Sequence, residues 1–379
     1  MTWVAFKMLT GNPGKYLSII LGIAFSSLLI AQQASIFCGL MRLTASQIRD
    51  IRGADIWVMD PNVQFIDDLK PMSDNELYRV RGVSGVKWAV RFYKGLTRGR
   101  LPDGNYQQMI LLGLDDATLI GAPQEIVAGQ LSDLRKPDAV FMDERGVEQL
   151  WPDDPYRLGR VFEMNDRRAI LVGVCRASQT FQTFPVVYTR YSQAVQFIPR
   201  ERKVLTFVLA QNDAEVPIAE VCRRIEQQTD LQALTREQFI WATIDYYMTR
   251  TGIPVNFGIT VLLGFLVGLA VAGQTFYLFT VENLRQFGTL KAIGVSNWRI
   301  LLMILFQAMV VGLLGYGLGV GMAGLFGEFT KGVSRLAFYM PWQVLALTGL
   351  AVVLIVILSS ILSIQRVLRL EPAVVFKGE

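Results

Sequence analysis

The side chains that most often do chemistry in proteins are scarce in this chain or lack a useful spacing. The sequence contains no histidine, which removes serine–histidine triads, histidine-bound metals and histidine acid–base catalysis. The acidic pairs Asp67–Asp68, Asp115–Asp116 and Asp153–Asp154 are typical of solvated turns, and no cysteine or carboxylate cluster has the spacing of a metal site. We therefore expect no catalytic constellation, no metal and no cofactor bound by this chain.

Three cysteines, Cys38, Cys175 and Cys222, are too few for a disulfide framework. Cys38 falls near the end of an apolar run, where we expect it to act as a small apolar residue. Cys175 and Cys222 fall in the same polar part of the chain, so a bridge between them stays open if that part faces an oxidising compartment. The sequence does not tell whether their Cα atoms lie within reach of each other.

One charged segment, residues 282–299, stands between two long apolar runs. A helix from Asn283 to Ile293 would place polar side chains on one face and leave the opposite face for packing. Gly294 is then expected as the left-handed residue that ends the helix, and Ser296 as the residue that opens the next one. The polar face would hold Glu282, Arg285, Gln286 and Thr289, and the opposite face Leu284, Phe287 and Lys291.

The composition predicts an integral membrane protein. Hydrophobic residues make up 52% of the 379 residues and charged residues 18%, and the mean hydropathy is positive. A helix rises about 1.5 Å per residue, so about 20 apolar residues cross the roughly 30 Å of hydrocarbon in a lipid bilayer. Four uncharged stretches are long enough to do so: 16–41, 254–281, 300–327 and 336–365.

Basic residues in the short connections predict the orientation, because Lys and Arg are retained on the cytoplasmic side. They precede the first stretch, lie within 282–299 and follow the last stretch. Both termini and the 282–299 segment are therefore expected inside the cell, and residues 42–253 outside. The basic residues form no patch interleaved with aromatics, which argues against nucleic-acid binding.

Residues 42–253 have the pattern of an α+β domain. Strands and helices at both ends predict one split lobe, 42–114 with 204–253, and a strand-rich run punctuated by Gly and Pro predicts an inserted lobe, 115–203. Ser73 with Glu76 three residues later predicts a capping box at a helix start. The expected strands are 56–59, 86–93, 106–114, 139–142, 161–164, 169–174, 186–189 and 204–210, and the expected helices 73–80, 216–228 and 235–251.

The apolar stretches carry two further signals. None contains a charged residue, whereas pumps and ion-coupled transporters place ionisable groups near the membrane midplane. The energy for any work would therefore enter through residues 282–299. Glycines four residues apart predict close helix packing, within the chain or across a dimer, with the third stretch the better candidate. These pairs are Gly264 and Gly268, Gly315 and Gly319, and Gly317 and Gly321.

The string Arg-Gln-Phe-Gly-Thr-Leu-Lys-Ala-Ile-Gly at 285–294, between the second and third stretches, resembles the permease subunit of MacB/FtsX-type ABC transporters. The large domain after the first stretch and the three further spans are similar to that family as well. The segment Thr235–Ile240, Tyr246–Tyr247 and the glycine-rich span that follows look most like the DevC branch, whose permeases are separate chains.

The resemblance implies a homodimer in the bacterial inner membrane that works with a separate ABC ATPase, which would hold the ATP and Mg. It also implies a periplasmic adaptor (a membrane fusion protein), an outer-membrane duct, and export of a lipid-like or other amphiphilic cargo. Residues 282–299 would be a coupling helix docked on the ATPase. The contact residues so implied are Glu282, Arg285, Gln286, Phe287, Gly288, Thr289, Leu290, Lys291, Ala292, Ile293 and Gly294.

The predicted fold is thus an α-helical membrane protein with four transmembrane helices and a large α+β extracytoplasmic domain. The resemblance makes its split lobe porter-like. The full division is an amphipathic elbow with the first span (1–41), a porter-like lobe (42–114 and 204–253), an inserted strand-rich lobe (115–203), the second span (254–281), the coupling helix (282–299), the third span (300–327), a short external loop (328–341), the fourth span (342–365) and a cytoplasmic tail (366–379).

One residue departs from the family pattern. Gln286 stands where relatives usually have Glu, so a charge contact to the ATPase would be replaced by a neutral hydrogen bond, which is typically weaker. Two other functions stay open: an FtsX-like signalling subunit that activates a cell-wall hydrolase, and a passive membrane-anchored scaffold or sensor.

Overall fold

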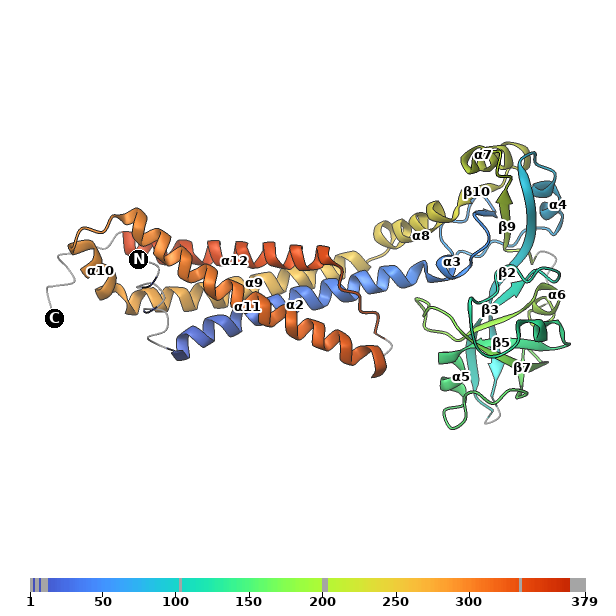
Figure 1. Ribbon diagram of the computed structural model, residues 1–379, viewed down its shortest axis with the longest axis horizontal. Helices are drawn as coiled ribbons and strands as arrows, with labels where there is room; N and C mark the ends of the chain where they lie inside the picture. Colours follow the sequence, from blue (N-terminus) through green and yellow to red (C-terminus); the bar gives the residue numbers. More distant parts are fainter. Residues whose placement is uncertain are drawn as a thin grey trace. The chain divides into compact units, whose positions relative to one another are not determined.

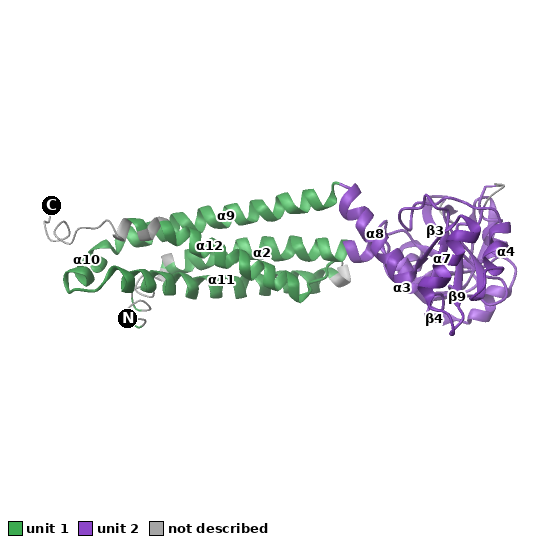
Figure 2. Ribbon diagram, turned by 90° about the horizontal axis from the view of Figure 1, so that it is seen from above, with its two compact units in different colours: residues 1–40, 252–379 green, residues 41–251 purple. Residues whose placement is uncertain are grey.

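The structure, a computed structural model, describes residues 13–101, 104–199, 204–333 and 336–368, together with Trp3 and Lys7. The chain divides into two compact units, Met1–Leu40 with Gly252–Glu379, and Met41–Thr251. Figure 2 colours them green and purple, and we call them the helical unit and the α+β unit. Most of the predicted N-terminal elbow and the predicted tail beyond residue 368 lie outside the described residues.

Among the described residues, four helices of the helical unit are long and apolar enough to cross a membrane, which confirms the predicted four-helix membrane part. They run side by side in Figures 1 and 2. Pro254 lies in the first turn of the second of them, where its missing N–H leaves no bond unmade. The helices of this unit are α2 (Pro13–Thr44), α9 (Ile253–Glu282), the short α10 (Leu284–Ala292), α11 (Asn297–Val333) and α12 (Trp342–Leu368).

The glycine pairs of α11 separate into a packed pair and an open pair. A Cβ atom on Gly315 would lie 2.7 Å from Cβ of Ile23, and one on Gly319 would lie 2.6 Å from Cβ of Ser27, so α11 packs backbone to backbone on α2. A Cβ atom on Gly317 or Gly321 would meet nothing within 4 Å. The close contact of the third span is therefore made within the chain, and only one of its two glycine pairs makes it.

The glycines of α9 pack on the same helix, α2. A Cβ atom on Gly264 would lie 3.2 Å from Cβ of Leu29, and Gly268 packs against Ser26. The Ser26 hydroxyl donates a 2.6 Å hydrogen bond to the carbonyl oxygen of Gly264. Both predicted glycine pairs that pack within the chain thus use α2 as their partner.

The α+β unit is built on a ten-stranded sheet, in the order β10-β1-β9-β2-β3-β8-β5-β7-β4, with β6 pairing to β2 and β7. The strands are β1 (Ile56–Met59), β2 (Val86–Arg100), β3 (Tyr106–Leu114), β4 (Glu125–Gly129), β5 (Ala139–Asp143), β6 (Val161–Met164), β7 (Arg167–Arg176), β8 (Val186–Arg190), β9 (Phe207–Asn212) and β10 (Gln232–Thr235). The helices are α3 (Ser46–Asp50), α4 (Asn75–Arg81), the 3-10 turn η1 (Leu131–Arg135), α5 (Glu144–Leu150), α6 (Tyr191–Ala194), α7 (Ile218–Thr229) and α8 (Arg236–Arg250).

The sheet has a hydrophobic core on each face, because successive strand residues point to opposite sides. Ile56 and Val58 of β1 join one cluster, which includes Val80 of α4 and Val221 of α7. Trp57 and Met59 of the same strand join the other cluster, with residues of α3 and α8. All four residues of β1 are therefore buried.

The long strand β2 belongs to both predicted lobes. Its first part, Val86–Phe92, pairs with β9, and its second part, Tyr93–Arg100, pairs with β3. β3 also pairs in parallel with β8. The backbone pairing therefore joins β3 to a strand of the 115–203 segment within one continuous sheet, and the division into two lobes at residue 114 stays a prediction.

The predicted capping box at Ser73 is corrected. Helix α4 begins at Asn75 with Asp74 as its N-cap residue, and no side chain caps it; Glu76 instead pairs with Arg79 at 2.8 Å. A capping box does form at α8, between Thr235 and Gln238. The open question of a disulfide is answered in the negative: Cys175 and Cys222 are both free, and they belong to the cores on opposite faces of the sheet.

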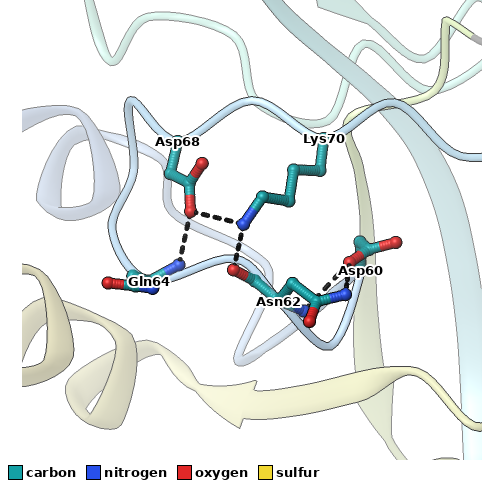
Figure 3. Close-up of polar contacts among 5 residues, drawn as sticks. All are labelled: Asp60, Asn62, Gln64, Asp68 and Lys70. Carbon is teal, nitrogen blue, oxygen red and sulfur yellow. Dashed lines mark hydrogen bonds and ion pairs between the residues drawn. The ribbon is translucent and has the colours of Figure 1, made fainter.

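The loop after β1 is held by internal polar contacts (Figure 3). Lys70 Nζ donates to the carbonyl oxygen of Asn62 and to Asp68 Oδ2, the latter at 3.0 Å, and Asp68 also accepts from the Gln64 backbone N–H at 3.0 Å. Asp60 accepts the Asn62 backbone N–H at 2.9 Å. Two other side chains of this loop contact the rest of the α+β unit. Phe65 stacks on Tyr246 of α8 with ring centroids 4.0 Å apart, and Asp67 pairs with the buried Lys94 of β2.

Candidate functional site

The charged segment between the second and third spans begins at Asn283, which ends α9 and starts α10. Its backbone N–H and its side-chain Nδ2 both donate to the carbonyl oxygen of Phe279, at 3.2 and 2.8 Å. Its own carbonyl accepts the backbone N–H of Phe287 at 3.1 Å. One residue therefore closes the last turn of α9 and opens the first turn of α10, so the two helices are joined without a flexible linker.

The other end of α10 is closed by a Schellman motif. Gly294 has φ of +92°, as predicted for a left-handed terminating residue. Its N–H donates to the carbonyl of Lys291, and the N–H of Val295 donates to the carbonyl of Leu290, both at 3.0 Å. Val295 and Leu290 also pack in one apolar cluster, the contact that usually accompanies this motif.

Phe287 anchors α10 to the start of α11. Its side chain is fully buried and packs with Ile300, Met303 and Ile304, and Gly288 beside it is buried too. Phe287 and Gly288 are thus buried within this chain, and the partner contact implied for them by the resemblance stays a prediction. Leu284, Leu290 and Val295 are partly buried around the same cluster. This face of α10 holds the helix in place.

The opposite face of α10 is exposed. The four polar residues predicted to share it, Glu282, Arg285, Gln286 and Thr289, are all exposed. The Thr289 hydroxyl donates to the carbonyl of Arg285 at 2.9 Å, so its donor is already used. The side chains of Arg285 and Gln286 make no hydrogen bond or ion pair with any residue that the structure describes.

Two large apolar side chains that follow α10 in the chain are exposed as well. Ile293 is 75% exposed and Trp298 is 67% exposed. Trp298 lies outside the residues picked from the sequence, although an aromatic residue in a polar connection was a visible signal; it lies in the first turn of α11, where tryptophan also suits the membrane–water interface. We call Arg285, Gln286 and Ile293 the α10 surface.

The perturbed titratable groups lie elsewhere, in the α+β unit. Burial raises the pKa of Asp143 to about 6, although a 2.7 Å bond from the backbone N–H of Val186 works against that rise. Burial lowers the pKa of Lys94, with Asp67 acting in the opposite direction. Burial also raises the pKa of the Cys175 thiol, which makes it an unreactive core residue. Among the described residues, no group of three or more metal-ligating side chains comes together.

The fold and this site define an α-helical membrane protein that carries a large α+β domain between its first two spans and an anchored helix between the next two. Residues 258–372 match the family model described as FtsX-like permease C-terminal, a stretch that includes most of α9, all of α10 and α11, and α12. This part of the chain is an FtsX-like permease domain.

Similar proteins carry related names. An uncharacterized ABC transporter permease of Mycobacterium bovis is 31% identical over 121 residues, which cover 32% of this chain and 33% of that protein. Another, of Mycobacterium tuberculosis, is 27% identical over 123 residues, which cover 32% of this chain and 34% of that protein. The chain thus matches about a third of the length of each relative.

Two solved structures that are similar to the chain are extracytoplasmic domains. The extracellular domain of the ABC-type transporter YknZ from Gram-positive bacteria aligns with a TM-score of 0.38 and 13% identity, over 48% of this chain and 100% of that one. The periplasmic region of MacB from Actinobacillus actinomycetemcomitans aligns with a TM-score of 0.37 and 15% identity, over 54% of this chain and 96% of that one.

Proposed function

We propose that this chain is the membrane subunit of an ABC transporter and that the α10 surface docks on a separate ATPase subunit. The observation that carries the proposal is the two-faced α10: one face is locked on α11 by Phe287, and the other presents Arg285, Gln286 and Ile293 with no partner among the described residues for the two polar side chains. Its place inside an FtsX-like permease domain, and the names of the similar proteins, support the same function.

A helix fixed in this way can transmit a displacement, caused by the ATPase, to the membrane spans. Asn283 joins α10 to α9 directly, and the Phe287 cluster joins it to α11, so a displacement of α10 moves the ends of two spans. Two helices connect the spans to the α+β unit along the chain. Only two residues separate α8 from α9, and α2 continues without a break to Thr44. ATP and Mg would be bound by the ATPase, and this chain would be non-catalytic.

The rest of the assembly follows the same proposal. The chain would form a homodimer in a bacterial inner membrane, with both termini and α10 in the cytoplasm and residues 42–253 in the periplasm, as the basic residues of the short connections favour. The periplasmic part would engage an adaptor and an outer-membrane duct, and a lipid-like or other amphiphilic cargo would be expelled through them. Gln286 would contribute a neutral hydrogen bond to the ATPase contact.

Site-specific photo-cross-linking tests the docking. A benzoylphenylalanine would replace Ile293 in the full chain expressed in its own cells, and the cross-linked partner would be identified by mass spectrometry. We expect a cross-link to a protein that contains a phosphate-binding loop of the GxxxxGK[ST] type. The matched control places the same group at Leu158, a 39% exposed loop residue of the α+β unit, and should not give this product.

A substitution then tests the energetics of the contact. Ile293→Asp should reduce the amount of ATPase that co-purifies with the full chain by about tenfold, because a charge replaces an apolar contact residue. Leu158→Asp should leave the yield unchanged. Cross-linking at 293 to no ATPase, or equal co-purification with Ile293→Asp and the parent chain, would overturn the proposal.

A further inference from the structure

The α+β unit contains a polar cavity with a volume of about 490 Å³, within the roughly 300–1,000 Å³ typical of small-molecule sites. It lies where the parallel strands β5 and β7 end, since Asp143 and Cys175 are paired at that edge. The end of α3 forms another wall. The residues that line it are Asp50, Pro123, Gln124, Glu125, Glu144, Arg145, Arg176, Ala177, Ser178, Gln179 and Tyr188.

Every charged side chain in the wall already has a partner in the wall. Arg176 lies between two carboxylates: it pairs with Glu125, and its Nε lies 3.2 Å from Glu144 Oε2. Arg145 donates to the side-chain oxygen of Gln179 at 2.5 Å. The charged side chains of the wall, three carboxylates and two guanidinium groups, are thus all hydrogen-bonded within the wall, and these contacts hold many donor and acceptor atoms in position.

Asp50 ties α3 to the inserted strands at this cavity. One carboxylate oxygen accepts the Ser178 backbone N–H and the other accepts the Ser178 hydroxyl, both at 2.7 Å, and the Asp50 carbonyl accepts from the side chain of Gln124 at 2.7 Å. α3 starts two residues after α2 ends. A ligand in the cavity would thus contact both the inserted strands and the segment that leads out of the first span.

Tyr188 is the part of the wall that its own surroundings leave unsatisfied. The residue is only 3% exposed and lines the cavity, yet no residue that the structure describes hydrogen-bonds to its hydroxyl. Burial, together with the nearby Asp50 and Asp143, raises its pKa well above the usual value, so the hydroxyl keeps its proton and can donate. The hydroxyl is therefore available to donate a hydrogen bond to an oxygen atom of a ligand in the cavity.

We propose that this cavity binds a neutral, polyhydroxylated small molecule, that is, a sugar, with the Tyr188 hydroxyl donating to one of its oxygens. Paired carboxylates, guanidinium groups and amides supply both donors and acceptors for sugar hydroxyls, and Pro123, Ala177 and the Tyr188 ring provide apolar contact area. The proposal does not depend on the docking of an ATPase, because all its residues belong to the α+β unit.

Saturation-transfer NMR on the full chain in lipid nanodiscs tests this proposal, in buffers free of glycoside detergents. The probes are glucose, N-acetylglucosamine and maltose, each titrated separately to about 10 mM, a range that detects the weak affinities expected of a few hydrogen bonds. We expect saturable transfer to the ring protons of at least one probe. Tyr188→Phe keeps the ring in the core and should weaken that binding about tenfold, the loss of one hydrogen bond.

The matched control is Tyr106→Phe, which removes a phenol hydroxyl from a residue that is 65% exposed and outside the cavity; it should bind like the parent chain. Glu144→Gln should weaken binding as well, since it removes a carboxylate from the wall. Two outcomes would overturn the proposal: no saturable transfer with any of the three sugars, or equal binding by Tyr188→Phe and the parent chain.

Discussion

The two units of this chain bury polar groups of different kinds. Among the described residues of the helical unit, the buried polar side chains are uncharged, and several bond to helix carbonyls: Ser26 to Gly264 at 2.6 Å and Ser360 to Val356 at 2.7 Å. The α+β unit instead buries a lysine and an aspartate, Lys94 and Asp143, whose side chains are charged in water at neutral pH. Each is held by specific partners, an aspartate for the lysine and backbone N–H groups for the aspartate.

The exposed surfaces of the two units also differ: that of the helical unit is apolar, and that of the α+β unit carries ion pairs. The helical unit exposes large apolar side chains along its spans, such as Val255 at 64% and Leu313 at 72%. Most ion pairs of the α+β unit lie at its surface, for example Arg223 with Glu220 at 2.8 Å. The difference follows from the surroundings of each unit. Hydrocarbon does not solvate charged groups, so the spans are held together by complementary shape and close backbone contact. A domain that faces water can instead stabilise a buried charge through a local partner.

The largest expected effect removes such a partner in the α+β unit. Asp67→Ala would leave the Lys94 ammonium, whose side chain is 3% exposed, without its carboxylate. We expect the amides of β2 and β9 to open more easily by about 3 kcal/mol, because an unpaired buried charge is costly. Hydrogen exchange of the full chain, read by mass spectrometry on peptides from these strands, measures this change.

Lys94→Met is the matched control for that experiment. It removes the charge and keeps an unbranched chain of similar length, so the protection of β2 and β9 should stay close to that of the parent chain. If Lys94→Met loosens the strands as much as Asp67→Ala does, the ion pair itself is stabilising and the comparison between the units is wrong on this point.

The second effect tests close packing in the helical unit. Gly319→Ala would place a Cβ atom 2.6 Å from Cβ of Ser27 and 2.8 Å from the Leu28 nitrogen, which forces α11 away from α2. We expect a loss of about 2–3 kcal/mol, seen as a lower midpoint for thermal loss of the monodisperse detergent-solubilised chain. In the control variant Gly317→Ala, the added Cβ atom would meet nothing within 4 Å, so the midpoint of the thermal transition should be unchanged or slightly higher. Equal losses for both variants would show that the spans are not held by backbone contact.

The smallest effect concerns the second of these residues, the buried Asp143. The pKa of Asp143 is about 6 in the fold and 3.8 in its ordinary state, so the folded protein binds this proton more tightly than the unfolded chain. The stability of the α+β unit should therefore fall by the order of 2 kcal/mol as the pH rises from about 4 to about 6, and show no further loss from this group above that range.

Asp143→Asn isolates this contribution. The amide stays neutral at every pH, and its oxygen can still accept the Val186 N–H, which is 2.7 Å from the carboxylate in the parent chain. Hydrogen exchange of β5 and β8 at pH 4, 5, 6 and 7, corrected for the intrinsic exchange rate, should show the fall in the parent chain and not in the variant. Parallel pH profiles for the two proteins would contradict a raised pKa at this residue.

Much of the local structure was predictable from the sequence. Strands β3 and β6 have the bounds that their alternation predicts, and Gly294 ends α10 as its spacing from Asn283 suggests. The short edge strand β4 was missed, because its Glu-Ile-Val-Ala-Gly segment is too short and too exposed to show a period. The predicted strand 86–93 was too short, because β2 continues to Arg100 through residues that do not alternate clearly between apolar and polar.

The candidate site was predictable in outline and not in detail. Periodicity separated the two faces of α10 correctly, yet it could not tell that Phe287 would meet Ile300 and Ile304. The proposed sugar cavity could not be predicted, since its wall comes from five separate parts of the chain: Asp50, 123–125, 144–145, 176–179 and Tyr188. Nothing local in any of these stretches indicates that they meet.

The sequence by itself therefore determines four apolar spans, a charged helix between two of them and the residue at which that helix ends, because hydrophobic length and glycine backbone freedom act over a few neighbouring residues. Long-range packing settles the rest: α11 meets α2 through Gly315 and Gly319 and leaves Gly317 and Gly321 open, although both pairs have the same spacing. Which of two equivalent helix faces is buried depends on the shape of a partner that lies far away along the chain.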